Sequence, residues 1–81
     1  MGTFRLQDGT VLMKGKRYLW SGTIEKLYID VIWKDNLCKI TNIDTKLKQV
    51  SVYEPFERKE YRYSYESINK FSFKPWWKLW R

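Results

Sequence analysis

The 81-residue sequence contains no histidine and a single cysteine, Cys38. One cysteine cannot form an internal disulfide, and without histidine the chain has too few of the ligand types that hold zinc. The lack of histidine also removes the commonest general base, so catalysis would need a carboxylate or lysine with a shifted pKa. Because the acidic residues are spread singly and Cys38 lies where a small apolar core residue is expected, we predict no enzymatic activity, metal or cofactor.

Glycine and proline are also scarce, with four and two copies. Gly9, Gly15 and Gly22 are spaced as turns and match neither of the glycine-rich phosphate-binding patterns, so no small-molecule substrate is expected. No run of 18 or more apolar residues suggests a membrane span, and residues 1–5 lack the apolar segment of a signal peptide. With a lone unpaired cysteine, these features predict a cytoplasmic protein.

Aromatic and basic residues are what the chain has in excess. Five Trp, six Tyr and four Phe can supply the apolar burial that so short a chain otherwise lacks. The formal net charge is +7, of which residues 1–66 contribute +3 and residues 67–81, without a single acid, contribute +4. This asymmetry favours a polyanion or an anionic surface as the partner.

The longest alternating stretch runs from Thr23 to Trp33 and predicts a central strand over residues 23–34. Its apolar side chains fall at every second position and should form one buried face: Leu27, Ile29, Val31 and Trp33. Ile40, Val50 and Val52 should extend this core from the two strands that follow. Residues 27–33 are rich in β-branched and aromatic types, which suit a half-buried pleated surface.

Turn residues divide the rest of the chain into short strands. The expected strands cover residues 4–6, 10–13, 17–20, 37–43, 47–53, 61–65 and 71–73. The expected turns are Asp8–Gly9, Ser21–Gly22, Asp35–Asn36 and an Asx-type turn at Asp44–Lys46. Residues 66–69 should make one 3₁₀ turn with Ile68 pointing inward, and Glu54 is expected among the loop and edge charges.

This pattern predicts an all-β domain over residues 1–74, followed by a Trp-rich basic tail over residues 75–81. Five short strands with a single helical turn before the last resemble the SH3-like small barrels of the Tudor and KOW type, a likeness of architecture that spans roughly residues 10–74. An OB-like barrel is the alternative, although it usually has a helix between its third and fourth strands and no helical period appears there.

Two stretches of the barrel are candidate nucleic-acid contacts. Lys14, Lys16 and Arg17 lie in a window of 16 residues without an acid, and such a loop can meet phosphates. The competing interpretation is a solvated loop with Tyr18 and Trp20 in the core. The stripe of Tyr61, Tyr63 and Tyr65 could form a base-stacking platform with Arg62 nearby, or it could be the core face of a late strand.

The tail is the third candidate, and it contributes six site residues: Lys74, Trp76, Trp77, Lys78, Trp80 and Arg81. If residues 76–81 are helical, the three tryptophans and Leu79 share one side, opposite Lys78 and Arg81. So short a helix is unstable alone, so the tail must dock on the barrel, bind a partner or lie at a membrane. We expect docking of at least one of Trp76 and Trp77, with Trp80 more exposed. The segment resembles tryptophan-rich cationic peptides that partition into anionic bilayers.

The sequence therefore predicts a non-enzymatic binding module whose partner is nucleic acid. The alternatives are a protein-interaction module, for example an accessory or mobile-element protein acting on a host protein, and peripheral membrane association through residues 74–81.

Overall fold

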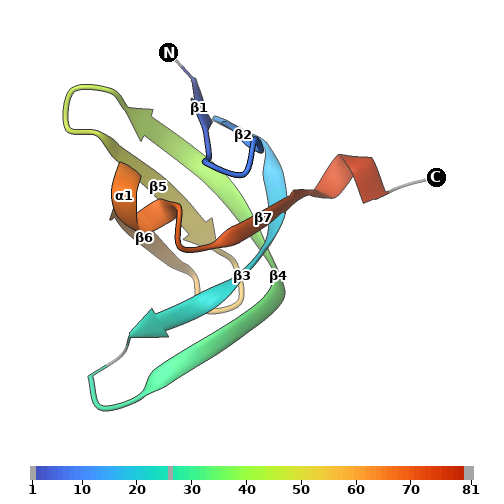
Figure 1. Ribbon diagram of the computed structural model, residues 1–81. Coiled ribbons are helices and arrows are strands. Elements are labelled where there is room, and N and C mark those ends of the chain that lie inside the picture. The colour runs from blue at the N-terminus through green and yellow to red at the C-terminus, as the bar shows by residue number, and fades with distance from the viewer. Residues whose placement is uncertain (1, 26, 80–81) are drawn as a thin grey trace.

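The computed structural model describes residues 2–25 and 27–79, which form β-strands and two short helical turns (Figure 1). In chain order the elements are β1 (Thr3–Arg5), β2 (Val11–Met13), β3 (Arg17–Glu25), β4 (Asp30–Asp44), β5 (Gln49–Glu54), β6 (Lys59–Ser64), α1 (Tyr65–Ile68), β7 (Ser72–Pro75) and the 3₁₀ turn η1 (Trp76–Leu79). The all-β prediction is confirmed.

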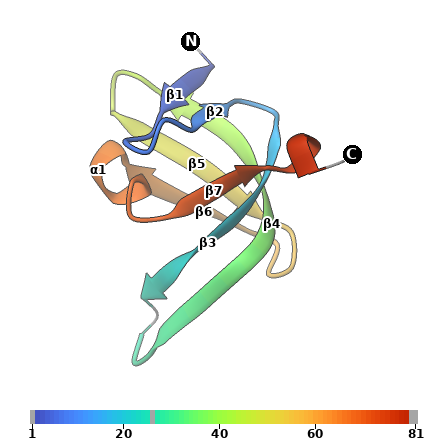
Figure 2. The ribbon, with the colours of Figure 1, turned by 45° about the vertical axis from the view of Figure 1, so that its right-hand side comes forward.

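The strands form a two-stranded sheet, β1–β2, and a five-stranded antiparallel sheet in the order β6-β5-β4-β3-β7. The long strand β4 bends, and its two ends pair with different neighbours (Figure 2). Residues 30–39 pair with β3, and residues 39–44 pair with β5. The register shifts once in each pairing, and such bulges bend a strand and increase its twist. The sheet therefore curls around a core.

Trp20 occupies the centre of that core and is fully buried. Five aromatic rings have their centroids within 5.0–6.2 Å of its ring: Trp33, Tyr61, Tyr63, Phe71 and Phe73. Trp33, Ile40, Val50 and Val52 are buried as predicted. Aromatic bulk thus supplies the burial that the short chain needs.

The predicted central strand over residues 23–34 is wrong. β3 ends at Glu25 and β4 begins at Asp30, so a hairpin turn lies in the middle of the alternating stretch. Leu27 is 87% exposed and Ile29 67% exposed, and Val31 is only half-buried. A period of two is equally compatible with one strand and with two strands joined at a tip, and no Gly, Pro or Asn marks this turn.

The turns predicted at Ser21–Gly22 and Asp35–Asn36 are wrong as well, because both pairs lie inside strands, at the bulge between β3 and β4. Asp35 has a φ of 51°, and its backbone N–H donates to the Ser21 hydroxyl over 2.8 Å. Asp tolerates the left-handed region in a bulge as readily as in a turn. Residues 37–43 therefore continue β4 instead of forming a separate strand.

Several local predictions are confirmed. The hairpin at Asp8–Gly9 joins β1 to β2, and the Asp44 carboxylate accepts the backbone N–H of Lys46 as an Asx turn requires. The single turn expected over 66–69 as a 3₁₀ turn is present one residue earlier as the α-helical turn α1, capped by Ser64, whose hydroxyl accepts the Ser67 N–H. It buries Ile68 as predicted.

Glu54 departs from its prediction as a loop or edge charge, because it is fully buried. Its carboxylate accepts the backbone N–H groups of Phe56 and Glu57 and so holds the turn between β5 and β6. A carboxylate can be buried when hydrogen bonds replace its water.

Candidate functional site

The outer face of the sheet carries a pair of opposed cations on neighbouring strands. Along β3 and β4 the buried Tyr18 and Cys38 alternate with the exposed Arg17 and Lys39. Arg17 lies directly opposite Lys39, and Lys39 lies opposite Tyr53 of β5. Like charges in opposing positions of an antiparallel pair destabilise the sheet. An anion placed over this pair would relieve that repulsion.

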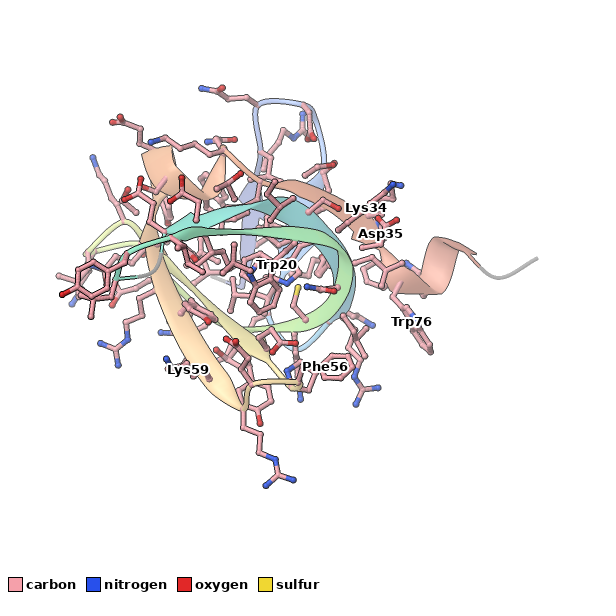
Figure 3. The ribbon with its side chains drawn as sticks, turned by 90° about the horizontal axis from the view of Figure 1, so that it is seen from below. Trp20, Lys34, Asp35, Phe56, Lys59 and Trp76 are labelled. Carbon is pink, nitrogen blue, oxygen red and sulfur yellow. The ribbon has the colours of Figure 1, made fainter. Side chains whose placement is uncertain are left out.

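The tail places aromatic side chains beside Arg17 and Lys39. Pro75 pairs with Tyr18 at the end of β7, and the Trp77 ring meets the Tyr18 ring edge-on at 5.3 Å. The Lys16 Nζ lies 5.6 Å from the centre of the Trp77 ring, within the range of a cation–π interaction. The expected docking of the tail is therefore observed, with Trp77 half-buried and Trp76, at the opening of η1, 36% exposed (Figure 3).

Two surface hollows meet beside Trp76, and both are lined by Arg17, Lys39 and Trp76. The smaller, of about 270 Å³, is completed by Gly15, Lys16 and Trp77. The larger, of about 480 Å³, is completed by Leu37, Cys38, Thr41, Tyr53 and Pro55. We call the two together the Trp76 groove. No acidic side chain is among the described residues that line it, and Glu60 lies one strand beyond Tyr53, where it accepts a hydrogen bond from Thr41.

The groove contains four of the predicted site residues, Lys16, Arg17, Trp76 and Trp77. Lys14 is exposed in the adjoining loop and does not line the groove. Lys74 lies on β7, where its ammonium is 3.6 Å from the Asp35 carboxylate. The predicted contacts of the Lys78 side chain, Trp80 and Arg81 lie outside the part of the chain that the structure describes, as does the expected exposure of Trp80.

Lys39 and Tyr53 are groove residues that the sequence analysis missed. Nothing in their local pattern distinguishes them, since each is one polar or amphipathic position on an alternating strand. Only the register of β3, β4 and β5 places them beside Arg17. A map of strand pairing would have been the necessary signal.

The predicted platform on β6 is divided between two faces of the sheet. Tyr61 and Tyr63 point inward, with ring centroids 6.2 Å from that of Trp20, whereas Arg62 points outward. Burial raises the pKa of Tyr63, and burial together with a 2.7 Å hydrogen bond to Glu57 raises that of Tyr61. Arg62 lines a separate outer hollow with Asp44 and Glu60. The structure thus favours the core interpretation of these tyrosines.

The described residues give little support for a reactive thiol, a metal site or a membrane-spanning helix. Burial raises the pKa of the Cys38 thiol, which favours its unreactive neutral form. No group of three potential metal ligands of the His, Cys, Asp and Glu types comes together within residues 2–25 and 27–79. In the same residues no helix is long and apolar enough to cross a membrane.

The chain was compared with models of known protein families, with curated proteins and with solved structures, and none of them matches it. The Trp76 groove is the feature of the molecule that indicates a function.

Proposed function

We propose that this chain is a small, non-enzymatic binding module that holds single-stranded nucleic acid in the Trp76 groove. The observation that carries the proposal is the pairing of Arg17 with Lys39 beside an exposed tryptophan, in a groove without an acidic lining residue. This arrangement costs stability in the free protein and suits a ligand that is both anionic and aromatic.

Each part of the groove matches one part of such a ligand. Lys16, Arg17 and Lys39 supply cations for phosphates, which dominate the affinity of most nucleic-acid complexes. Trp76 and Tyr53 present rings on which unpaired bases can stack. Because the bases of a duplex are already stacked on one another, single strands should bind more tightly than duplexes of the same length.

The architecture fits the same role. We propose that the five-stranded sheet is an SH3-like small barrel of the Tudor and KOW type, with β7 as its last strand. The strand order and the single turn α1 before β7 support this assignment. Surface binding on such a scaffold needs no catalytic group, in keeping with the absence of histidine and the burial of Cys38.

The test compares two double variants that remove the same charge. Arg17→Ala/Lys39→Ala removes the opposed cations, whereas Lys46→Ala/Lys59→Ala removes two exposed lysines away from the groove. In a fluorescence anisotropy titration with a labelled single strand, the groove variant should flatten the slope of log affinity against log salt by about 1.4, at 0.7 per phosphate contact. The control should change the slope far less.

Trp76→Ala separates stacking from charge. We expect it to weaken binding by about 1–3 kcal/mol, the usual contribution of one stacked base, and to leave the salt slope unchanged. The proposal is wrong if neither DNA nor RNA single strands bind at low salt with micromolar protein. Salt-insensitive capture of a protein, or binding of anionic vesicles in place of oligonucleotides, would instead favour the two alternatives from the sequence.

A further inference from the structure

The hairpin formed by β3 and β4 extends away from the core (Figures 1 and 2). It carries several large apolar side chains that are exposed to solvent. Four of these side chains are between 67% and 91% exposed: Leu27, Tyr28, Ile29 and Ile32. Residues of this kind gathered in one place on a small domain typically mark an interaction surface.

The backbone of this hairpin is open along both of its edges. β7 pairs with β3 only over residues 18–21, and β5 pairs with β4 only from Lys39 onward. Within the described chain, no strand lies beside residues 30–34 on the side away from β3. An exposed edge with unpaired backbone groups is a template for another strand.

We propose that the β4 edge of the hairpin, residues 30–34, pairs with the same edge of a second copy of the chain. The two strands run antiparallel, and the pairing is centred on Ile32. The order Asp30, Ile32, Lys34 is self-complementary in that register. Each Asp30 then lies opposite the Lys34 of the other copy, and the two Ile32 side chains meet on the twofold axis. Val31 and Trp33 alternate with these residues along the strand. Asp30 lies opposite Lys34 whether Ile32 and its copy form a hydrogen-bonded or a non-hydrogen-bonded pair, because the register is the same in both cases.

The distribution of charge favours a second copy over an anionic partner at this site. Residues 23–35 carry three acids and two bases, a net of −1, whereas the rest of the chain carries +8. The hairpin is thus a part of a basic molecule that has no net positive charge to repel a second copy. Ile24, which pairs with Val31 in this hairpin, lies seven residues along β3 from Arg17. At 3.3 Å per residue this is about 23 Å, so the centre of the proposed interface is well separated from the cations of the Trp76 groove.

The dimer should be weak. Five residues from each copy, with the tip side chains beside them, bury less than the roughly 800 Å² per partner of a standard stable interface. We therefore expect the mass measured by sedimentation equilibrium to rise from that of a monomer toward twice that value as the protein concentration increases from micromolar to millimolar.

A charge-swap experiment tests the register directly. Asp30→Lys alone places two positive charges opposite each other at both ends of the interface, and Lys34→Asp alone places two negative charges there. Each variant should remain a monomer at concentrations where the wild type dimerises. An equimolar mixture of the two variants should form a heterodimer, because the opposed charges become complementary again. Both positions are exposed, so melting curves should confirm that each variant folds.

Leu47→Arg is the matched control for the apolar contact, since Leu47 is 66% exposed and lies in the turn between β4 and β5. Ile32→Arg should abolish dimerisation, and Leu47→Arg should leave it unchanged. A wild type that stays monomeric at millimolar concentration overturns the proposal, and so does a charge-swapped mixture that fails to associate. Loss of vesicle binding by Ile32→Arg in a protein that never dimerises would show that the hairpin meets lipid instead.

Discussion

Single residues in the core show how far this small domain depends on aromatic bulk. The indole N–H groups of Trp20 and Trp33 are buried, and neither has a hydrogen-bond acceptor in the described protein. An unsatisfied buried donor costs about 1–3 kcal/mol. Trp20 nevertheless contacts five other rings, and burial of so large a side chain outweighs that cost.

Cys38, Tyr18 and Tyr63 should make the folded protein less stable at alkaline pH. Burial raises the pKa of Cys38 above its usual 9.0 and those of Tyr18 and Tyr63 above 10.0. Above pH 9 the unfolded chain therefore loses protons that the folded chain keeps. Stability should be complete below pH 9 and then fall as pH rises toward the folded-state values, by at most about 1.4 kcal/mol per pH unit for each group.

Urea denaturation at a series of pH values measures this decline. Cys38→Ala should remove the loss of stability that begins near pH 9. The loss that the tyrosines cause above pH 10 should remain. An unfolding midpoint that stays constant from pH 8 to pH 11 would contradict the burial of these groups.

At the scale of elements, the close contact between β3 and the residue before β7 should be intolerant of any added atom. A Cβ at Gly22 would lie 2.3 Å from Cδ1 of Phe71. That ring packs between Trp20 and Tyr63, with both centroids at 5.0 Å, so any shift of the ring would disturb both contacts. We expect Gly22→Ala to cost about 1–3 kcal/mol in the free energy of unfolding.

Gly2→Ala is the matched control, because its Cβ would meet Lys14 at an ordinary 3.4 Å. Thermal melts should show a clear loss for Gly22→Ala and nearly none for Gly2→Ala. If the contact is the cause, Phe71→Leu in the Gly22→Ala background should cost much less than it does in the wild type.

For the whole molecule, the tail should contribute to stability and to binding through different tryptophans. Removing residues 76–81 keeps β7 but deletes the contact between Trp77 and Tyr18. The melting temperature should fall by several degrees, since about 1 kcal/mol corresponds to 4–8 °C in a domain of this size. Trp77→Ala should reproduce most of that fall.

Trp76→Ala should instead lower the melting temperature less than Trp77→Ala does, because Trp76 is the more exposed of the two, while it weakens oligonucleotide binding. An unchanged melting temperature after truncation would show that the tail does not help to hold the sheet. Equal losses of stability in both single variants would contradict the division of roles.

The sequence by itself determined the β class, the hairpins at Asp8–Gly9 and Asp44–Lys46, the helical turn before β7 and the burial of Val50 and Val52. These features depend on residues close together in the chain, whose turn chemistry and alternation need no distant partner. The lack of histidine likewise limits the chemistry that the chain can perform, whatever its fold.

Only the tertiary structure decided where the alternating faces are buried. The stretch from Thr23 to Trp33 alternates throughout, yet its middle forms the turn between β3 and β4, beyond the core, and Leu27 is exposed there. The Trp76 groove likewise unites Arg17, Lys39 and Tyr53 with the tail through the register of three strands. Alternation specifies two faces but not which face meets the core, and register depends on contacts between residues far apart in the sequence.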